Sequence, residues 1–425
     1  MENSEKKLQN DTYIVGMGCV TSNSRNIKEL TLALRDGIRN FGYIHNTSFI
    51  GAEISLDGLK ESLETYYTML PNSITKKIKG CIHRATKEML ATIISVVEAY
   101  IEAQIVRKKM LGERIGIIIA GSNLTYKNKE EYIRKCMNTP EYLSPQYALN
   151  LFDTSYMSVI SEIFDFNGEG IVVGGASASG NSAIIKAFQL IQLGAVDICF
   201  VIAPPSGMSS MEIQSFYNIG ALGGKKYNSN PLKACRPFDT NHEGFILGEA
   251  AACIVLESKK SIYKRKIASS KQVLGGAIFL DGNRLSNPSL SGEMRAMEIA
   301  MANSGVNAKD ISYINAHGTS SPLGDEIEAE AIKNVFRENL GHVWVNSTKG
   351  ILGHCMNSAG VIEAIATIVQ MDYKFIHMNA NLEKPITDKI LFTGKDHIDT
   401  KIKYALSNSF GFGGINTSIV LMNKQ

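Results

Sequence analysis

Apolar runs alternate with amphipathic segments along the first half of the chain. Wholly apolar or β-branched runs that are too short for helices predict buried strands at residues 13–21, 115–121, 171–173, 198–204 and 252–256. Longer segments with apolar residues at helical spacing predict helices at residues 27–36, 74–105 and 181–193. Strands that are apolar on both faces and separated by helices are typical of parallel-rich sheets covered by helices on both sides. The pattern therefore predicts an α/β fold.

The same pattern restarts after about residue 265. It predicts strands at residues 273–280, 311–315, 343–347, 404–407 and 417–422, and helices at residues 293–303, 325–336 and 359–371. The repeat is one of pattern rather than of residue identity. We expect two pseudo-repeated halves, residues 10–265 and 266–425, which pack as one body because no low-complexity linker separates them.

Composition excludes several classes of protein. The chain has 425 residues and a net charge of +3, which is too small to indicate a nucleic-acid partner. Its 7 cysteines lack the paired spacing of a zinc site or a disulfide framework, so we expect reduced core thiols and no bound metal. Gly16 and Gly18 lack the third glycine of a dinucleotide fingerprint. No apolar run reaches the roughly 18 residues of a membrane span, and residues 1–11 do not form a signal peptide. We expect a cytoplasmic enzyme.

The Gly-Gly-Ala-Ser-Ala-Ser-Gly turn at residues 174–180 holds Ser177 between an apolar strand and an apolar helix. The free N–H groups of the first helical turn favour negative charge near this side chain. A turn of this kind can be purely structural, but two histidines downstream change the interpretation. His317 and His354 each follow a strand-like run, and a Gly-rich loop at residues 408–414 completes the set. Together these residues favour chemistry on an acyl group.

This ordered set resembles the β-ketoacyl synthases, the condensing enzymes of fatty-acid and polyketide synthesis, over nearly the whole chain. The matching segments lie at residues 15–18, 236–239, 244–249, 315–320, 322–325, 347–349, 353–354 and 408–416. The resemblance implies a thiolase-like fold, with two similar halves in five αβαβα layers, and usually a homodimer. It also implies that acyl chains arrive on the 4'-phosphopantetheine arm of an acyl carrier protein, with no cofactor bound by the enzyme itself.

Ser177 stands where the family carries the cysteine that takes the acyl chain. A serine hydroxyl is much harder to ionise than a thiol, so we expect acyl transfer to residue 177 to be strongly impaired. Decarboxylation of a malonyl thioester needs only donors aimed at the enolate oxygen, which His317 and His354 can supply as neutral imidazoles. The chain resembles the free-standing Ser-variant ketosynthases of polyketide β-branching cassettes, which implies conversion of malonyl-[acyl-carrier protein] to acetyl-[acyl-carrier protein] beside other enzymes of the cassette.

The resemblance also assigns supporting residues. Lys349 with Glu328 is similar to the family's buried ion pair beside the histidines. Phe412 matches the gating aromatic residue of the Gly-Phe-Gly-Gly loop, where its N–H and that of Ser177 would frame an anion hole. Asn416 closes the matching segment.

Three alternatives stay open at this stage. Ser177 could itself be acylated, which would make the chain an initiating acyltransferase or ketosynthase. The chain could instead be a non-catalytic partner subunit similar to a chain-length factor, or a hydrolase that clears stalled chains.

A cluster of basic residues lies at the head of the helix predicted from residue 74. Its members are Lys76, Lys77, Lys79 and Arg84. Such a cluster can be a solvated helix face, but this region resembles one that contacts the acidic carrier protein in related synthases. We therefore expect it to bind the carrier protein.

Overall fold

The computed structural model describes residues 11–83, 85–105 and 110–424. The strands of the first half are β1 (Thr12–Thr21), β2 (Gly42–Tyr43), β3 (Ile50–Ala52), β4 (Ile115–Ala120), β5 (Gly170–Val173), β6 (Ile198–Ala203), β7 (Leu247–Gly248) and β8 (Ala250–Ser258). Its helices are α1 (Ile27–Asp36), α2 (Leu59–Glu64), α3 (Asn72–Ile82), α4 (Lys87–Glu102), α5 (Tyr126–Cys136), α6 (Tyr147–Asn150), α7 (Thr154–Phe164), α8 (Ser179–Gln192), α9 (Ser210–Asn218) and α10 (Lys259–Arg265).

The second half repeats the alternation of strands and helices. Its strands are β9 (Lys271–Leu280), β10 (Tyr313–Asn315), β11 (Trp344–Asn346), β12 (Phe375–Ile376), β13 (Leu391–Phe392), β14 (Ile398–Asp399), β15 (Tyr404–Gly411) and β16 (Ile415–Asn423). Its helices are α11 (Leu290–Ser304), α12 (Pro322–Phe336), α13 (Lys349–Leu352) and α14 (Ala359–Tyr373). In the part of the chain that the structure describes, no helix is both long and apolar enough to cross a membrane.

The main sheet has the strand order β13-β11-β10-β15-β16-β9-β1-β8-β6-β4-β5. One part of this sheet runs from β13 to β9 and the other from β1 to β5. Among the described residues, the two parts are joined by the short pairing of β1 with β9, through Thr12 with Val273 and Tyr13 with Gln272. Parallel pairing links β4 to β5 and β6, and β10 to β11 and β15. Strands β8, β1, β9 and β16 pair antiparallel. Each part is therefore a mixed sheet, whereas the uniformly apolar strands predicted a parallel-rich one.

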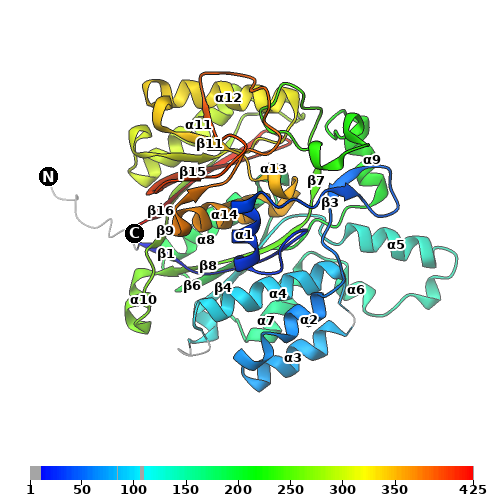
Figure 1. Ribbon diagram of the computed structural model, residues 1–425. Coiled ribbons are helices and arrows are strands. Elements are labelled where there is room, and N and C mark those ends of the chain that lie inside the picture. Colours follow the sequence, from blue (N-terminus) through cyan, green and yellow to red (C-terminus); the bar gives the residue numbers. More distant parts are fainter. Residues whose placement is uncertain (1–10, 84, 106–109, 425) are drawn as a thin grey trace.

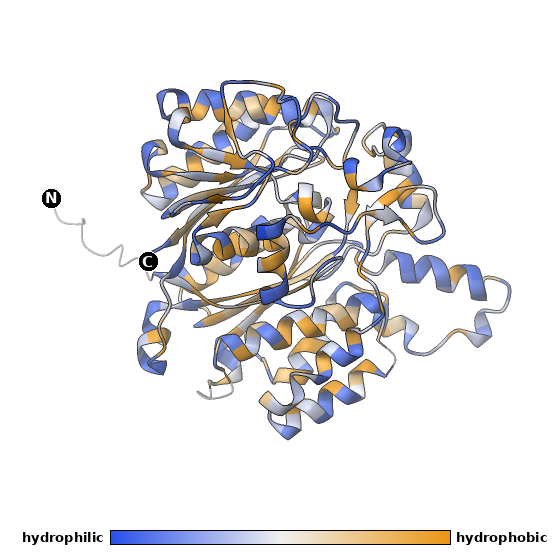
Figure 2. Ribbon diagram, in the orientation of Figure 1, coloured by the Kyte–Doolittle hydropathy of each residue, from blue (hydrophilic) through white to orange (hydrophobic). Residues whose placement is uncertain are grey.

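Five layers follow from how the helices cover these strands (Figure 1). Helices α8 and α14 lie in the middle and pack against strands of both parts of the sheet. Helices α4 and α7 cover the outer face of one part, and α11 covers the outer face of the other, with α12 packed beside it. All residues of α14 from 359 to 371 are buried, which suits a helix enclosed on every side. Figure 2 shows the apolar residues concentrated in these central elements.

The long helix predicted over residues 74–105 is wrong, because the structure divides it into α3 and α4. The side chain of Thr86 accepts a hydrogen bond from the N–H of Met89 and so caps the start of α4. An N-cap residue has extended backbone, which interrupts a continuous helix. The apolar spacing runs through this break because both helices turn an apolar face to the same core.

The two central helices begin with matching turns and cross at a pair of glycines. One short 3-10 turn, Ala176–Ala178, precedes α8, and another, Met356–Ser358, precedes α14. Ala176 and Met356 both have left-handed backbone, with φ of 49° and 52°. A Cβ on Gly180 would lie 2.8 Å from the Cα of Gly360. The two backbones therefore touch, and they bring the two turns together.

Candidate active site

A cavity of about 390 Å³ opens where these two turns meet. Six of the seven residues that the sequence predicted for the site line it: Ser177, His317, Glu328, His354, Phe412 and Asn416. They come from segments up to 239 positions apart, since 416 minus 177 is 239. The seventh, Lys349, lies behind the cavity and is 1% exposed.

Ser177 sits in the turn before α8, and its side chain points at His354. Its Oγ lies 2.8 Å from Nε2 of His354, and both residues are buried. The hydroxyl of Ser409 donates to the Ser177 carbonyl oxygen at 2.8 Å, which ties the turn to β15. The left-handed backbone of Ala176 aims the following residue into the cavity.

The hydrogen bonds of His354 identify the nitrogen that carries its proton. The backbone N–H of Met356 donates to Nδ1 of His354 at 3.3 Å, so Nδ1 is an acceptor and holds no proton. A neutral imidazole with a free Nδ1 carries its proton on Nε2. The Nε2–H of His354 therefore donates to Ser177 Oγ. In this arrangement His354 does not act as a base toward the Ser177 hydroxyl.

His317 is the second imidazole of the cavity. Its ring lies 5.4 Å from that of His354, centroid to centroid, and is nearly perpendicular to it. Its Nδ1 is buried and has no hydrogen-bond partner among the described residues. The two imidazoles therefore line one cavity side by side.

Both histidines are held in the neutral form. Burial lowers the pKa of His317 well below its ordinary value, and the charge of Lys349 and the ring of His354 lower it further. Burial and then Lys349 also lower the pKa of His354. Two neutral rings, each with one N–H group, can donate hydrogen bonds to an oxyanion.

The predicted ion pair between Lys349 and Glu328 is wrong. Lys349 Nζ pairs with Oε1 of Glu363 on α14, and the two side chains are 1% and 2% exposed. Glu328 instead accepts the backbone N–H groups of His317 and Gly318, at 2.8 and 2.7 Å. These bonds fix the loop that carries the first histidine.

Sequence reasoning missed Glu363, although a signal was present. It is the one acidic residue in the apolar segment 359–371, and a carboxylate in a buried helix needs a partner. Burial raises the pKa of Glu363 to about 7, and Lys349 opposes that rise. Lys349 acts on the site through its charge, because it does not line the cavity.

The Gly-rich loop forms the turn between β15 and β16 at the rim of the cavity. Phe412 is 39% exposed, and its ring centroid lies 6.2 Å from that of Phe216. The backbone N–H groups of Ser177 and Phe412 donate no hydrogen bond to any described residue. Asn416 donates from Nδ2 to Oδ2 of Asp281 at 3.2 Å. The N–H groups of Ser177 and Phe412 are thus left as donors for a ligand.

The predicted carrier-protein residues do not line the cavity. Lys76, Lys77 and Lys79 lie on α3, which Figure 1 shows well away from α9. Phe216 of α9 lines the cavity, whereas none of these three lysines does. Lys77 Nζ pairs with Oδ1 of Asp165 at 2.6 Å, and Lys79 lies over the ring of Tyr67. Arg84 lies outside the described residues. A single copy of the chain therefore does not bring these lysines to the site.

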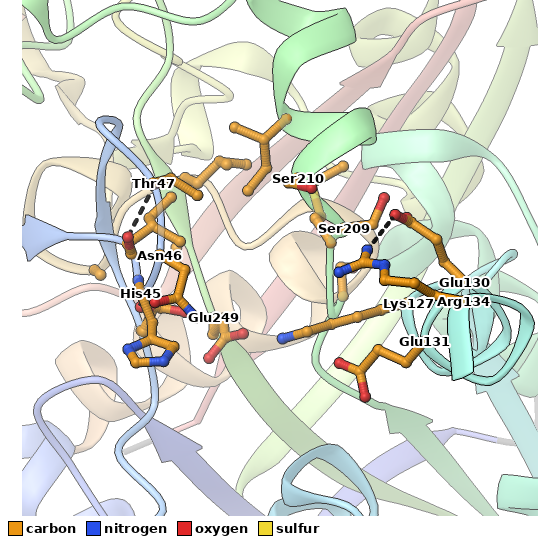
Figure 3. A pocket seen from close by; sticks show the side chains of 18 residues that line it. His45, Asn46, Thr47, Lys127, Glu130, Glu131, Arg134, Ser209, Ser210 and Glu249 are labelled. Carbon is orange, nitrogen blue, oxygen red and sulfur yellow. Dashed lines mark hydrogen bonds and ion pairs between the residues drawn. The ribbon is translucent and has the colours of Figure 1, made fainter.

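A second hollow, of about 360 Å³, lies between α5 and the start of α9 (Figure 3). Lys127 and Glu131 reach into it from α5, while Glu249 lies across from them. Glu249 is already engaged, since its Oε2 pairs with Lys87 Nζ at 2.6 Å. The hollow contains none of the predicted site residues, and its mixed charges indicate no ligand of one sign.

Comparison with known proteins identifies what this architecture is similar to. Residues 9–261 match the family model "Beta-ketoacyl synthase, N-terminal domain", and residues 271–383 match "Beta-ketoacyl synthase, C-terminal domain". The polyketide biosynthesis malonyl-ACP decarboxylase PksF of Bacillus subtilis (strain 168) is 34% identical over 421 residues, which cover 98% of this chain and 97% of the relative. The 3-oxoacyl-[acyl-carrier-protein] synthase 2 of Staphylococcus aureus is 29% identical over 412 residues, which cover 96% of this chain and 99% of the relative.

Solved structures show the same fold. A type II PKS acyl-carrier protein in complex with its ketosynthase matches with a TM-score of 0.84 at 20% identity, over 98% of this chain and 100% of that one. A β-ketoacyl synthase from Burkholderia phymatum STM815 matches with a TM-score of 0.82 at 23% identity, over 98% and 100%. The thiolase-like arrangement predicted from the sequence is thereby confirmed.

Proposed function

Since the chain belongs to the β-ketoacyl synthase family, we propose that it converts malonyl-[acyl-carrier protein] to acetyl-[acyl-carrier protein] in polyketide β-branching. The relative from B. subtilis carries the name of this activity. One observation carries the proposal: the proton between Ser177 and His354 belongs to the histidine. The site therefore offers hydrogen-bond donors and lacks an activated nucleophile.

The reaction follows from these donors. The bond between Cα and the malonyl carboxylate breaks, CO2 leaves, and the electron pair forms an enolate of the thioester. Negative charge then develops on the thioester oxygen, where one N–H group from each of His317 and His354 stabilises it. Both rings are already neutral, so neither has to lose a proton before this step. Burial keeps them neutral by lowering their pKa values, and the charge of Lys349 adds to this effect.

The arrangement of the site argues against acylation of Ser177. A serine nucleophile needs a base that takes its proton, whereas His354 donates to Ser177 Oγ. The segment also lacks the Gly-x-Ser-x-Gly elbow centred on this serine. The retained histidines and Lys349 likewise argue against a non-catalytic partner subunit, and the same missing base argues against a hydrolase.

Intact-mass spectrometry of malonyl-loaded carrier protein tests this function. The enzyme should remove the mass of CO2 from the carrier protein without gaining an acyl mass itself. Ser177→Ala should still decarboxylate, because no step uses the serine as a nucleophile. An acyl group retained on Ser177 would instead establish the acyltransferase, and release of free acid would establish the hydrolase.

We also propose that the enzyme is a cytoplasmic homodimer that accepts the 4'-phosphopantetheine arm of its carrier protein into the cavity. Five large apolar side chains in residues 126–152 are exposed, which suits burial by a second copy. They are Ile133, Met137, Tyr142, Leu149 and Phe152, which are 56–79% exposed.

Charge reversal on α3 tests whether the basic residues of this helix bind the carrier protein. We expect Lys76→Glu and Lys77→Glu to weaken binding of the acidic carrier protein about tenfold at low salt, with the difference vanishing at high salt. Lys76 should show the cleaner effect, because Lys77 also pairs with Asp165. Lys401→Glu, an exposed lysine near the C-terminus, is the matched control. Affinity unchanged at low salt would exclude this surface.

A further inference from the structure

The cavity contains a carboxyl group that the steps described above leave unused. Glu293 lies in the first turn of α11, lines the same cavity as the two histidines, and is 1% exposed. Its Oε2 is buried and has no hydrogen-bond partner among the described residues. The neighbouring Gly292 packs against Asn416, since a Cβ there would lie 2.6 Å from Asn416 Nδ2. The side chain of Ser289 caps α11 by accepting the N–H of Gly292, and this first turn places Glu293 at the cavity.

The surroundings of Glu293 favour its protonated form. Burial raises its pKa well above the ordinary value, and the charges of Glu328, Asp281 and Asp325 raise it further. These three carboxyl groups already have partners: Glu328 and Asp325 accept backbone N–H groups, and Asp281 accepts from Asn416. Glu293 has none. A neutral carboxylic acid therefore faces the cavity.

Decarboxylation creates a need that a condensing reaction does not have. In condensation the electron pair on Cα attacks an acyl group, so no proton is added to that carbon. In the proposed reaction the enolate must gain a proton on Cα to become an acetyl group. The two histidines are poor sources, because a neutral imidazole N–H is a very weak acid. A carboxylic acid with a raised pKa is a far better match for this transfer.

We propose that Glu293 is the general acid that protonates Cα of the enolate, an inference that rests on the proposed decarboxylation. The O–H bond of Glu293 breaks, the C=C electron pair of the enolate takes the proton as a new C–H bond, and a lone pair on the enolate oxygen re-forms the thioester carbonyl. The products are acetyl-[acyl-carrier protein] and the Glu293 carboxylate. Solvent then returns the proton to Glu293, so each turnover consumes one malonyl group and one proton and releases one CO2.

The test compares Glu293→Gln and Glu293→Asp with the wild-type protein. Gln keeps the shape of the side chain but has no acidic proton, so kcat for acetyl formation should fall about 10²-fold, with KM for malonyl-[acyl-carrier protein] little changed. Asp retains an acid and should restore part of the rate. Glu298→Gln, a partly exposed position on the same helix that pairs with Arg295, is the matched control and should match the wild type.

A second readout isolates the proton transfer from the loss of CO2. Wild-type enzyme incubated with acetyl-[acyl-carrier protein] in D2O should exchange deuterium into the acetyl methyl group, and Glu293→Gln should lose this exchange. Both Glu293 variants should keep the wild-type Tm, because no hydrogen bond of the carboxyl is removed.

The outcomes separate this inference from the proposed function. If the wild type decarboxylates its substrate and Glu293→Gln matches it in both activity and deuterium exchange, the role of Glu293 is overturned and the proposed function stands. Equal losses in Gln and Asp, with methyl exchange intact in both, would also overturn it and indicate a structural role. A wild type without decarboxylation would overturn both proposals.

Discussion

Alanine in place of either His317 or His354 should lower the rate of malonyl decarboxylation about 10²–10³-fold. Each substitution removes one fixed donor aimed at the developing enolate oxygen, and the loss of one such donor costs about 2.7–4 kcal/mol of transition-state stabilisation. The rate is measured as acetyl-carrier protein formed per unit time by intact mass. KM should change less than kcat, because the donors act mainly on the transition state.

Two further variants decide how the histidines act. His354→Gln retains an N–H donor on the side chain and should keep more activity than His354→Ala, whereas a proton-transfer role would make the two equally inactive. His342→Ala, at an exposed position in the 3-10 segment that follows α12, is the control for the loss of an imidazole. Full activity in His317→Ala and His354→Ala would show that the cavity does not use these rings.

Replacing Lys349 by Met should lower the free energy of unfolding by about 3–5 kcal/mol, because Glu363 would be left buried without a counter-charge. The loss should grow as the pH rises from 6 to 8. Glu363 already has a pKa raised to about 7, and without Lys349 that pKa rises further. An acid with a raised pKa in the folded state is tolerated when protonated and destabilises the fold as it ionises. Urea unfolding at the two pH values measures the effect.

A second substitution identifies the partner of Lys349. Lys349→Met combined with Glu363→Met should recover most of the lost stability, since an apolar pair can replace a buried ion pair. The combination with Glu328→Gln should not recover it, because Glu328 holds backbone N–H groups instead. Recovery with Glu328→Gln and not with Glu363→Met would restore the pairing predicted from the sequence.

Much of the fold is predictable because its central strands are continuously apolar. Strands β4, β6 and β8 are buried at every residue, so their short apolar runs stand out from the helices. The break at Thr86 does not stand out, since a single hydrogen bond accepted by the threonine side chain interrupts an apolar pattern that otherwise continues. Strand direction also follows from tertiary pairing, which apolarity does not encode. The division into halves at residues 265 and 266 stays a prediction.

The site divides in the same way. Ser177, His317 and His354 lie in distinctive glycine-rich segments, and the structure places them in one cavity, although their catalytic roles stay predictions. Glu363 stands out as the one acidic residue of an apolar segment, but Glu293 does not, because only the packing of neighbouring elements makes it buried. A carboxyl in a helix with other polar residues is usually solvent-exposed, so nothing in the sequence marks Glu293.

The contact between Gly180 and Gly360 lets the site tolerate substitutions of the side chains around the cavity. The separation of Ser177 and His354 is fixed by two main chains in contact, and a Cβ on Gly360 would lie 2.5 Å from the backbone nitrogen of Asn181. Side chains around the cavity can therefore be exchanged to accept different acyl groups without moving the serine away from the imidazole. A single methyl group at the crossing would act as a wedge between the halves. Substitutions are thus tolerated at the side chains that line the cavity, whereas Gly180 and Gly360 admit almost no variation.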